Sequence, residues 1–236
     1  MPAAELARSF RDARSAEEAF EAAELAFRQG DEELGVYLEE KLAGACPSNA
    51  ASFEPPHAKT RWAFERLEAF CAGFTTDMIA RALAHYDAGG AAPFDLEKER
   101  LVDALSAADR GFESEALAEF AALADTPAGI DAASVTVLRW AETYGDFRPE
   151  LGQDPDVPDH QLSAIMEAAF PLYECRVFGG CGPGGVTVLE RCMTHGVCEP
   201  GWDMETFYMS NISPYQYEQA SKVVDFLATL RRRLQP

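Results

Sequence analysis

The sequence lacks a long apolar run and a leader-like N-terminus. No segment reaches the roughly 18 apolar residues that a membrane span needs, so we predict no membrane partner. The first thirty residues carry acidic side chains throughout and no uninterrupted apolar core, so we expect neither a secretory signal nor a transit peptide. A cytoplasmic location is the default prediction for such a chain.

Positive charge is also scarce. The 20 Lys and Arg residues stand against 40 Asp and Glu, which gives a net charge of −20. This excess would repel a phosphate backbone, so we predict no nucleic-acid partner. Such an excess is usually a solubility device, and a protein partner with a basic surface is the less common alternative. The 47% content of hydrophobic residues predicts a globular fold, and 236 residues can bury a core without cross-links.

Complete catalytic signatures are missing as well. The chain has no serine-hydrolase elbow, and its glycine run is not followed by the Lys and Ser or Thr of a phosphate-binding loop. No Glu-x-x-His pair of a di-metal helical site is present. Whether the protein is an enzyme therefore stays open.

The N-terminal third predicts a helical hairpin. Apolar residues recur at three- and four-residue spacings over residues 3–29, which places them on one helical face. Gly30 ends this run, and Asp31 is a suitable N-cap for a second helix. Gly44 and Pro47 end the second helix.

Residues 16–49 resemble a single tetratricopeptide unit, and a poorer echo spans residues 98–127. The resemblance rests on small residues, a helix-connecting turn and a closing proline: Ala23, Gln29, Gly30, Asp31, Gly35 and Pro47. It implies a protein-binding groove. Ordinary helical hairpins account for the same residues, because a repeat array needs about three stacked units.

The rest of the chain predicts more helices and one boundary. A helical tract covers residues 60–87, with a break at Thr75 and Thr76, and a final helix starts at Pro214. Residues 148–159 are rich in proline and acid. We therefore predict a helical domain over 1–147, a linker over 148–159 and a C-terminal segment over 160–236.

The most distinctive stretch, residues 174–201, holds four of the six cysteines. Two β-branched or aromatic runs, 176–178 and 186–189, flank a Pro-Gly pair typical of a type II turn. We therefore predict a small β-hairpin in an otherwise helical fold. With this turn, Cys175 lies opposite Cys192, close enough for a disulfide.

Two other arrangements of these cysteines are open. A register with its turn centred three residues later, on Val186 and Thr187, would pair Cys175 with Cys198 and Cys181 with Cys192. Alternatively, Cys181, Cys192, His195 and Cys198 gather at one end of the hairpin, where soft ligands of this kind suit zinc or an iron centre.

Two functions fit these features. The first is an acidic protein-interaction or regulatory module whose cysteine hairpin is fixed by metal or disulfide. The alternative is an enzyme whose site is the hairpin, either as a metal centre or with a reactive thiol. In the thiol version, Cys192 or Cys198 pairs with His195.

Overall fold

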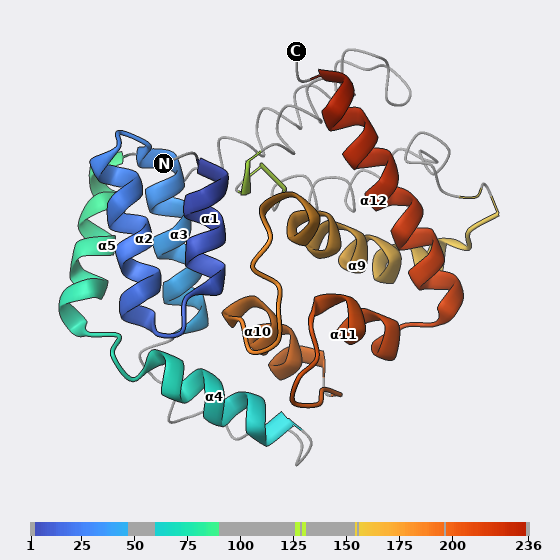
Figure 1. The fold of residues 1–236 in the computed structure, drawn as a ribbon, viewed down its shortest axis with the longest axis horizontal. Helices are drawn as coiled ribbons and strands as arrows, with labels where there is room; N and C mark the ends of the chain where they lie inside the picture. The colour runs from blue at the N-terminus through green and yellow to red at the C-terminus, as the bar shows by residue number, and fades with distance from the viewer. Residues whose placement is uncertain are drawn as a thin grey trace. The chain divides into compact units, whose positions relative to one another are not determined.

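The computed structural model describes residues 3–46, 60–89, 126–127, 129–130, 154, 156–195 and 197–234. All regular elements in these ranges are helices, which confirms the prediction of a mainly helical fold (Figure 1). They are α1 (Ala3–Asp12), α2 (Ala16–Arg28), α3 (Glu32–Ala45), α4 (Arg61–Cys71), α5 (Thr76–Gly89), α9 (Asp159–Phe178), α10 (Val186–His195), α11 (Met204–Asn211) and α12 (Pro214–Leu234). None of them has the length and apolar character needed to cross a bilayer.

The chain forms two compact units, and each is discontinuous in sequence. The first unit comprises Met1–Ala92 and Phe178–Asn211, and the second comprises Pro93–Val177 and Ile212–Pro236. The predicted linker at 148–159 falls within the sequence of the second unit and lies largely outside the described residues, as does the repeat echo at 98–127. Both stay predictions.

The N-terminal hairpin forms as predicted, with one extra break. Residues 3–29 make two helices, because Ser15 caps α2 by accepting a hydrogen bond from the Glu18 amide at 3.2 Å. Gly30 ends α2 with a φ of +79°, and the Asp31 carboxylate accepts from the Leu34 amide at the start of α3. Helices α2 and α3 pack against each other.

The first unit is completed by helices from both parts of its sequence. Helix α5 packs on α3, so that α1, α2, α3 and α5 lie side by side, with α4 running across one end of the group (Figure 1). The predicted break between α4 and α5 is confirmed, and Thr75 accepts from the Met78 amide there. Helix α10 packs on α4 and α1, and α11 packs on α10.

The predicted β-hairpin is wrong. Residues 176–178 form the last turn of α9, which continues through Pro171, and residues 186–189 begin α10. Short β-branched runs cannot be told from buried helix by composition, and helical burial prevails here. Val186, Val188, Leu189 and Cys192 are each at most 2% exposed, at spacings that share one helical face. The Pro-Gly segment therefore connects two helices.

The second unit contains α9 and α12. Ser213 and Gln216 form a reciprocal cap, in which each side chain accepts from the other's backbone amide. Pro214 occupies the first position of α12, as predicted. Lys222 on α12 forms an ion pair with Asp154 at 2.8 Å, and this contact, followed by one from Gln219, lowers the pKa of the Asp154 carboxyl.

Candidate functional site

All six cysteines are disulfide-bonded in the structure. Cys46 pairs with Cys71, and Cys192 pairs with Cys198 across a Cα–Cα distance of 5.3 Å. The predicted bridge between Cys175 and Cys192 is therefore wrong, and so is the register that joins Cys181 to Cys192. Both relied on the hairpin; on a helix, Cys192 instead faces the chain that folds back directly after α10.

The predicted metal-ligand set is not available in this oxidised form. Cys181, Cys192 and Cys198 are in disulfides and carry no thiolate to bind a metal. The backbone of His195 ends α10, and its side chain lies outside the described part of the structure. No group of three metal-binding side chains is found among the described residues. The thiol-enzyme interpretation likewise has no free sulfur at Cys192 or Cys198.

The disulfide between Cys192 and Cys198 closes a short loop, which we call the 192–198 loop. Both cysteines are buried, with exposed fractions of 0% and 2%. Between them, Val197 is 42% exposed, which makes it one of the few large apolar residues that the described structure leaves open to solvent. The loop thus has a covalently closed, buried base and an apolar side chain at its surface.

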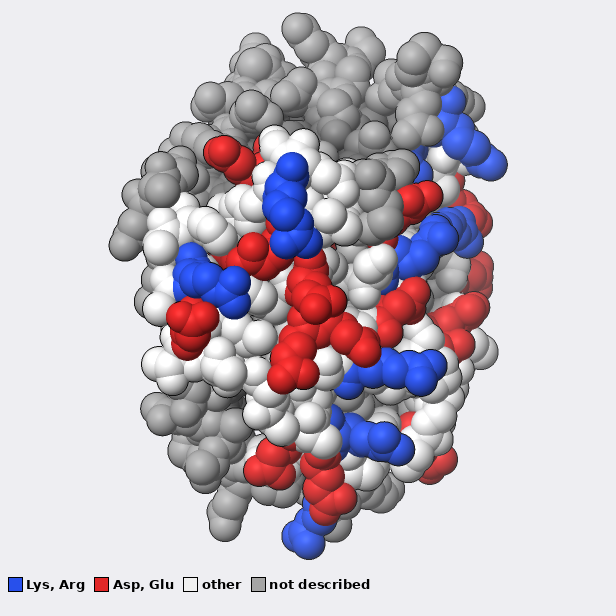
Figure 2. Space-filling model, turned by 60° about the vertical axis from the view of Figure 1, so that its left-hand side comes forward, with Lys and Arg blue, Asp and Glu red and all other residues white. Residues whose placement is uncertain are grey.

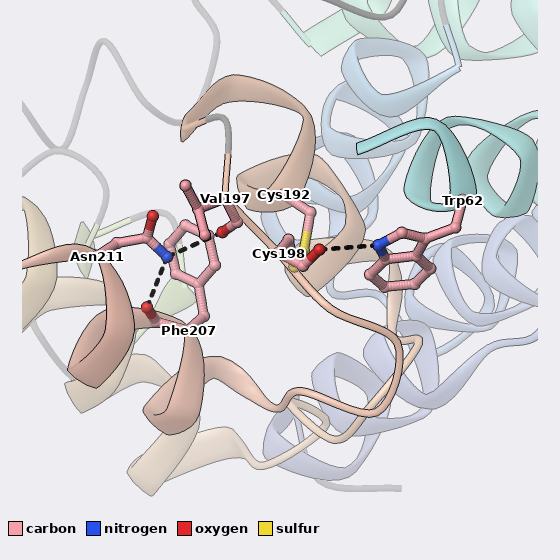
Figure 3. Close-up of a disulfide and its surroundings, with 6 residues drawn as sticks. All are labelled: Trp62, Cys192, Val197, Cys198, Phe207 and Asn211. Atoms are coloured by element: carbon pink, nitrogen blue, oxygen red, sulfur yellow. Dashed lines mark hydrogen bonds between the residues drawn. A yellow bond between two sulfur atoms is a disulfide. The ribbon is translucent and has the colours of Figure 1, made fainter. Parts of the chain in front are cut away.

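Side chains from two other helices hold the loop at consecutive carbonyl groups (Figure 3). The Trp62 indole on α4 donates to the Cys198 carbonyl at 3.0 Å. The Asn211 amide on α11 donates to the Val197 carbonyl at 3.0 Å, and also to the Phe207 carbonyl at 2.8 Å. Two hydrogen bonds and one disulfide therefore fix the backbone next to Val197.

Each of these donors is itself held in place. Helix α11 is capped by Asp203, whose carboxylate accepts from the Thr206 amide at 2.8 Å. Hydrogen bonds from the Thr206 side chain and backbone lower the pKa of Asp203, so the cap stays ionised. Trp62 sits on α4, which the Cys46–Cys71 disulfide ties to the end of α3. The donors are thus parts of an ordered frame.

No sequence motif assigns Trp62 or Asn211 to a site. Trp62 is one of several aromatic residues at helical spacing in residues 60–87, a pattern that predicts core, and Asn211 begins an Asn-Ile-Ser glycosylation sequon. The i,i+4 spacing of Phe207 and Asn211 permits the bond within α11. Nothing in the sequence indicates the bond from Asn211 to Val197, because α11 and the loop meet only in the fold.

The glycine-rich segment before α10 allows the backbone to pack closely against α1. Gly179 and Gly180 have positive φ values, and the backbone passes close to α1. Arg8 donates to the Phe178 carbonyl at 3.0 Å, and Arg11 donates to the Gly179 carbonyl at 3.3 Å. The segment therefore presents carbonyl groups to cations, which is opposite in sign to a phosphate-binding loop.

Comparisons with protein-family models, with curated proteins and with solved structures give no match for this chain.

Proposed function

We propose that this chain is an acidic protein-interaction module and that the 192–198 loop is its contact point. The observation that carries the proposal is an exposed Val197 on a backbone fixed by a disulfide and two hydrogen bonds. An apolar side chain presented on a rigid loop binds without the cost of ordering that loop.

The charge of the chain indicates the kind of partner. With a net charge of −20, the protein attracts a basic surface and repels an acidic one. Figure 2 shows acidic side chains grouped near the centre of one face, with basic side chains around them. We therefore propose a partner that offers an apolar pocket for Val197 and that carries a net positive charge. The acidic composition leaves such a basic partner open.

The disulfides indicate the compartment. Stable disulfides form and persist in oxidising environments and are rare in the cytosol. With all six cysteines oxidised, we propose that the protein works in an oxidising compartment, in place of the default cytoplasmic location. In that setting, the disulfide at the base of the loop stays closed.

A pair of matched variants tests the contact point. We expect a photo-crosslinking residue at position 197 to capture a partner in cells, and the same residue at position 209 to capture none. Met209 is 59% exposed and apolar, so it controls for non-specific stickiness. With the captured partner purified, Val197→Asp should weaken binding at least about tenfold, and Met209→Asp by less than about twofold, as measured by calorimetry.

The proposal also requires a salt effect. Affinity should fall as salt is raised, because screening reduces the attraction between the acidic chain and a basic partner. Equal crosslinking at the two positions, or equal loss of affinity in the two variants, would show that the loop is not the contact point. An affinity that does not change with salt would contradict the basic partner.

A further inference from the structure

A buried carboxylate lies in the interface between α3 and α5 of the first unit. The Glu39 side chain on α3 is 2% exposed, and both of its oxygens lie 3.0–3.1 Å from Nδ1 of His85 on α5. The His85 side chain is 35% exposed. Burying a carboxylate is costly unless a cation compensates it, and His85 can supply that cation only when it is protonated.

The imidazole is held in position from a third helix. The ring of Phe27 on α2 stacks on the His85 ring with a centroid distance of 4.0 Å. Phe27 in turn lies over Gly35 of α3, where a Cβ atom would come within 2.7 Å of the phenyl ring. Gly35 therefore leaves room for the phenyl ring that supports His85.

The other charged groups near this pair form ion pairs with one another. Arg81 on α5 pairs with Glu24 on α2 at 3.0 Å and with Asp77 at 3.4 Å, and it lies over the Phe20 ring. Burial is the largest effect on Glu39 and raises its pKa; contact with His85 and the charge of Arg81 oppose the increase, whereas the charge of Glu24 adds to it. Contact with His85 therefore supplies part of the compensation that the buried Glu39 carboxylate requires.

We propose that α5 is a proton-dependent latch, docked on α2 and α3 in acid through the Glu39–His85 pair and loosened as the pH rises. This inference does not depend on the proposed binding function. Two effects act in the same direction. The pKa of the Glu39 carboxyl is higher in the folded protein than in the unfolded chain. Its protonation therefore stabilises the fold at pH values below the unfolded-state pKa, and this stabilisation is lost as the pH rises through the folded-state pKa. In addition, a neutral imidazole leaves the buried Glu39 carboxylate without a compensating cation.

Hydrogen–deuterium exchange of the full chain tests the latch. After correction for intrinsic exchange rates, amide protection in α5 should fall roughly tenfold as the pH rises from about 4, below the ordinary glutamate pKa of 4.5, to about 8.5. Protection in α2 should change much less. Glu39→Gln should remove this pH dependence, because a neutral amide can accept from the imidazole without a buried charge.

Glu24→Gln is the matched control, because it breaks the other tie between α5 and α2, which involves no imidazole. It should lower α5 protection at every pH. It should also shift the pH dependence toward lower pH without removing it, because the Glu24 charge adds to the raised pKa of Glu39. If Glu39→Gln fails to fold, NMR of the wild-type protein decides: the α5 exchange must follow the protonation of the Glu39 carboxyl. Unchanging protection in the wild type, or a pH dependence that survives in Glu39→Gln, would overturn the latch.

Discussion

At the scale of single residues, the glycines between α9 and α10 perform different tasks. Gly180 has a φ of +74°, and a Cβ atom there would clash with the Arg11 side chain. Gly184 also has a positive φ, of +78°, but nothing lies within 4 Å of its Cβ position. Gly182 has neither constraint. Substitutions at these three positions can therefore distinguish the cost of a steric clash from the cost of backbone strain.

Alanine at each of these positions should give a graded loss of stability. We expect Gly182→Ala to be nearly neutral, Gly184→Ala to cost about 1 kcal/mol from backbone strain, and Gly180→Ala to cost at least about 2 kcal/mol because the clash adds to the strain. Denaturant unfolding measures the three values. Equal losses in all three variants would mean that Arg11 does not pack on this turn.

At the scale of elements, two of the disulfides fix helices in different ways. Cys46–Cys71 joins the end of α3 to the end of α4 across 25 residues, whereas Cys192–Cys198 closes only the turn after α10 across 6. The longer connection removes more conformational freedom from the unfolded chain. Its Cys46 end is also buried, at 3% exposed.

Replacing each pair with alanine should therefore cost different amounts. Loop-closure entropy predicts a loss of about 3.5 kcal/mol for C46A/C71A and about 2 kcal/mol for C192A/C198A. Urea unfolding under non-reducing conditions measures both losses. A larger loss in C192A/C198A would show that packing around the buried sulfur atoms, rather than chain entropy, dominates there.

At the scale of the whole molecule, the chain contains disulfides and also passes back and forth between its two compact units. Each unit takes its residues from two separate parts of the sequence, and the chain passes between the units at residues 92–93, 177–178 and 211–212. The sequence is long enough to bury a core without cross-links, so the disulfides at all six cysteines add stability beyond what the size of the chain requires.

A thiol count tests this state directly. Protein isolated with an alkylating agent and no reductant should show no labelled cysteine in mass spectrometry, and six after denaturation and reduction. A reducing agent should lower the unfolding temperature. Native protein that labels readily and contains bound zinc would instead restore the metal site predicted at Cys181, Cys192, His195 and Cys198.

The sequence by itself determined part of the helical fold, namely the N-terminal hairpin, the break between α4 and α5, and the start of α12. Helical periodicity predicted the N-terminal hairpin, and the capping residues Asp31 and Ser213 with Pro214 mark where α3 and α12 begin. These signals are local: a cap bonds to an amide three residues away, so the information lies within a few residues of sequence.

Only the tertiary structure decided the cysteine pairing and the candidate site. Residues 176–178 and 186–189 have strand-like composition, yet they are helical because their apolar side chains bury on helical faces. That change moved Cys192 away from Cys175 and toward Cys198. Trp62 and Asn211 reach the 192–198 loop from helices α4 and α11, and such contacts depend on how helices pack, which no local pattern encodes.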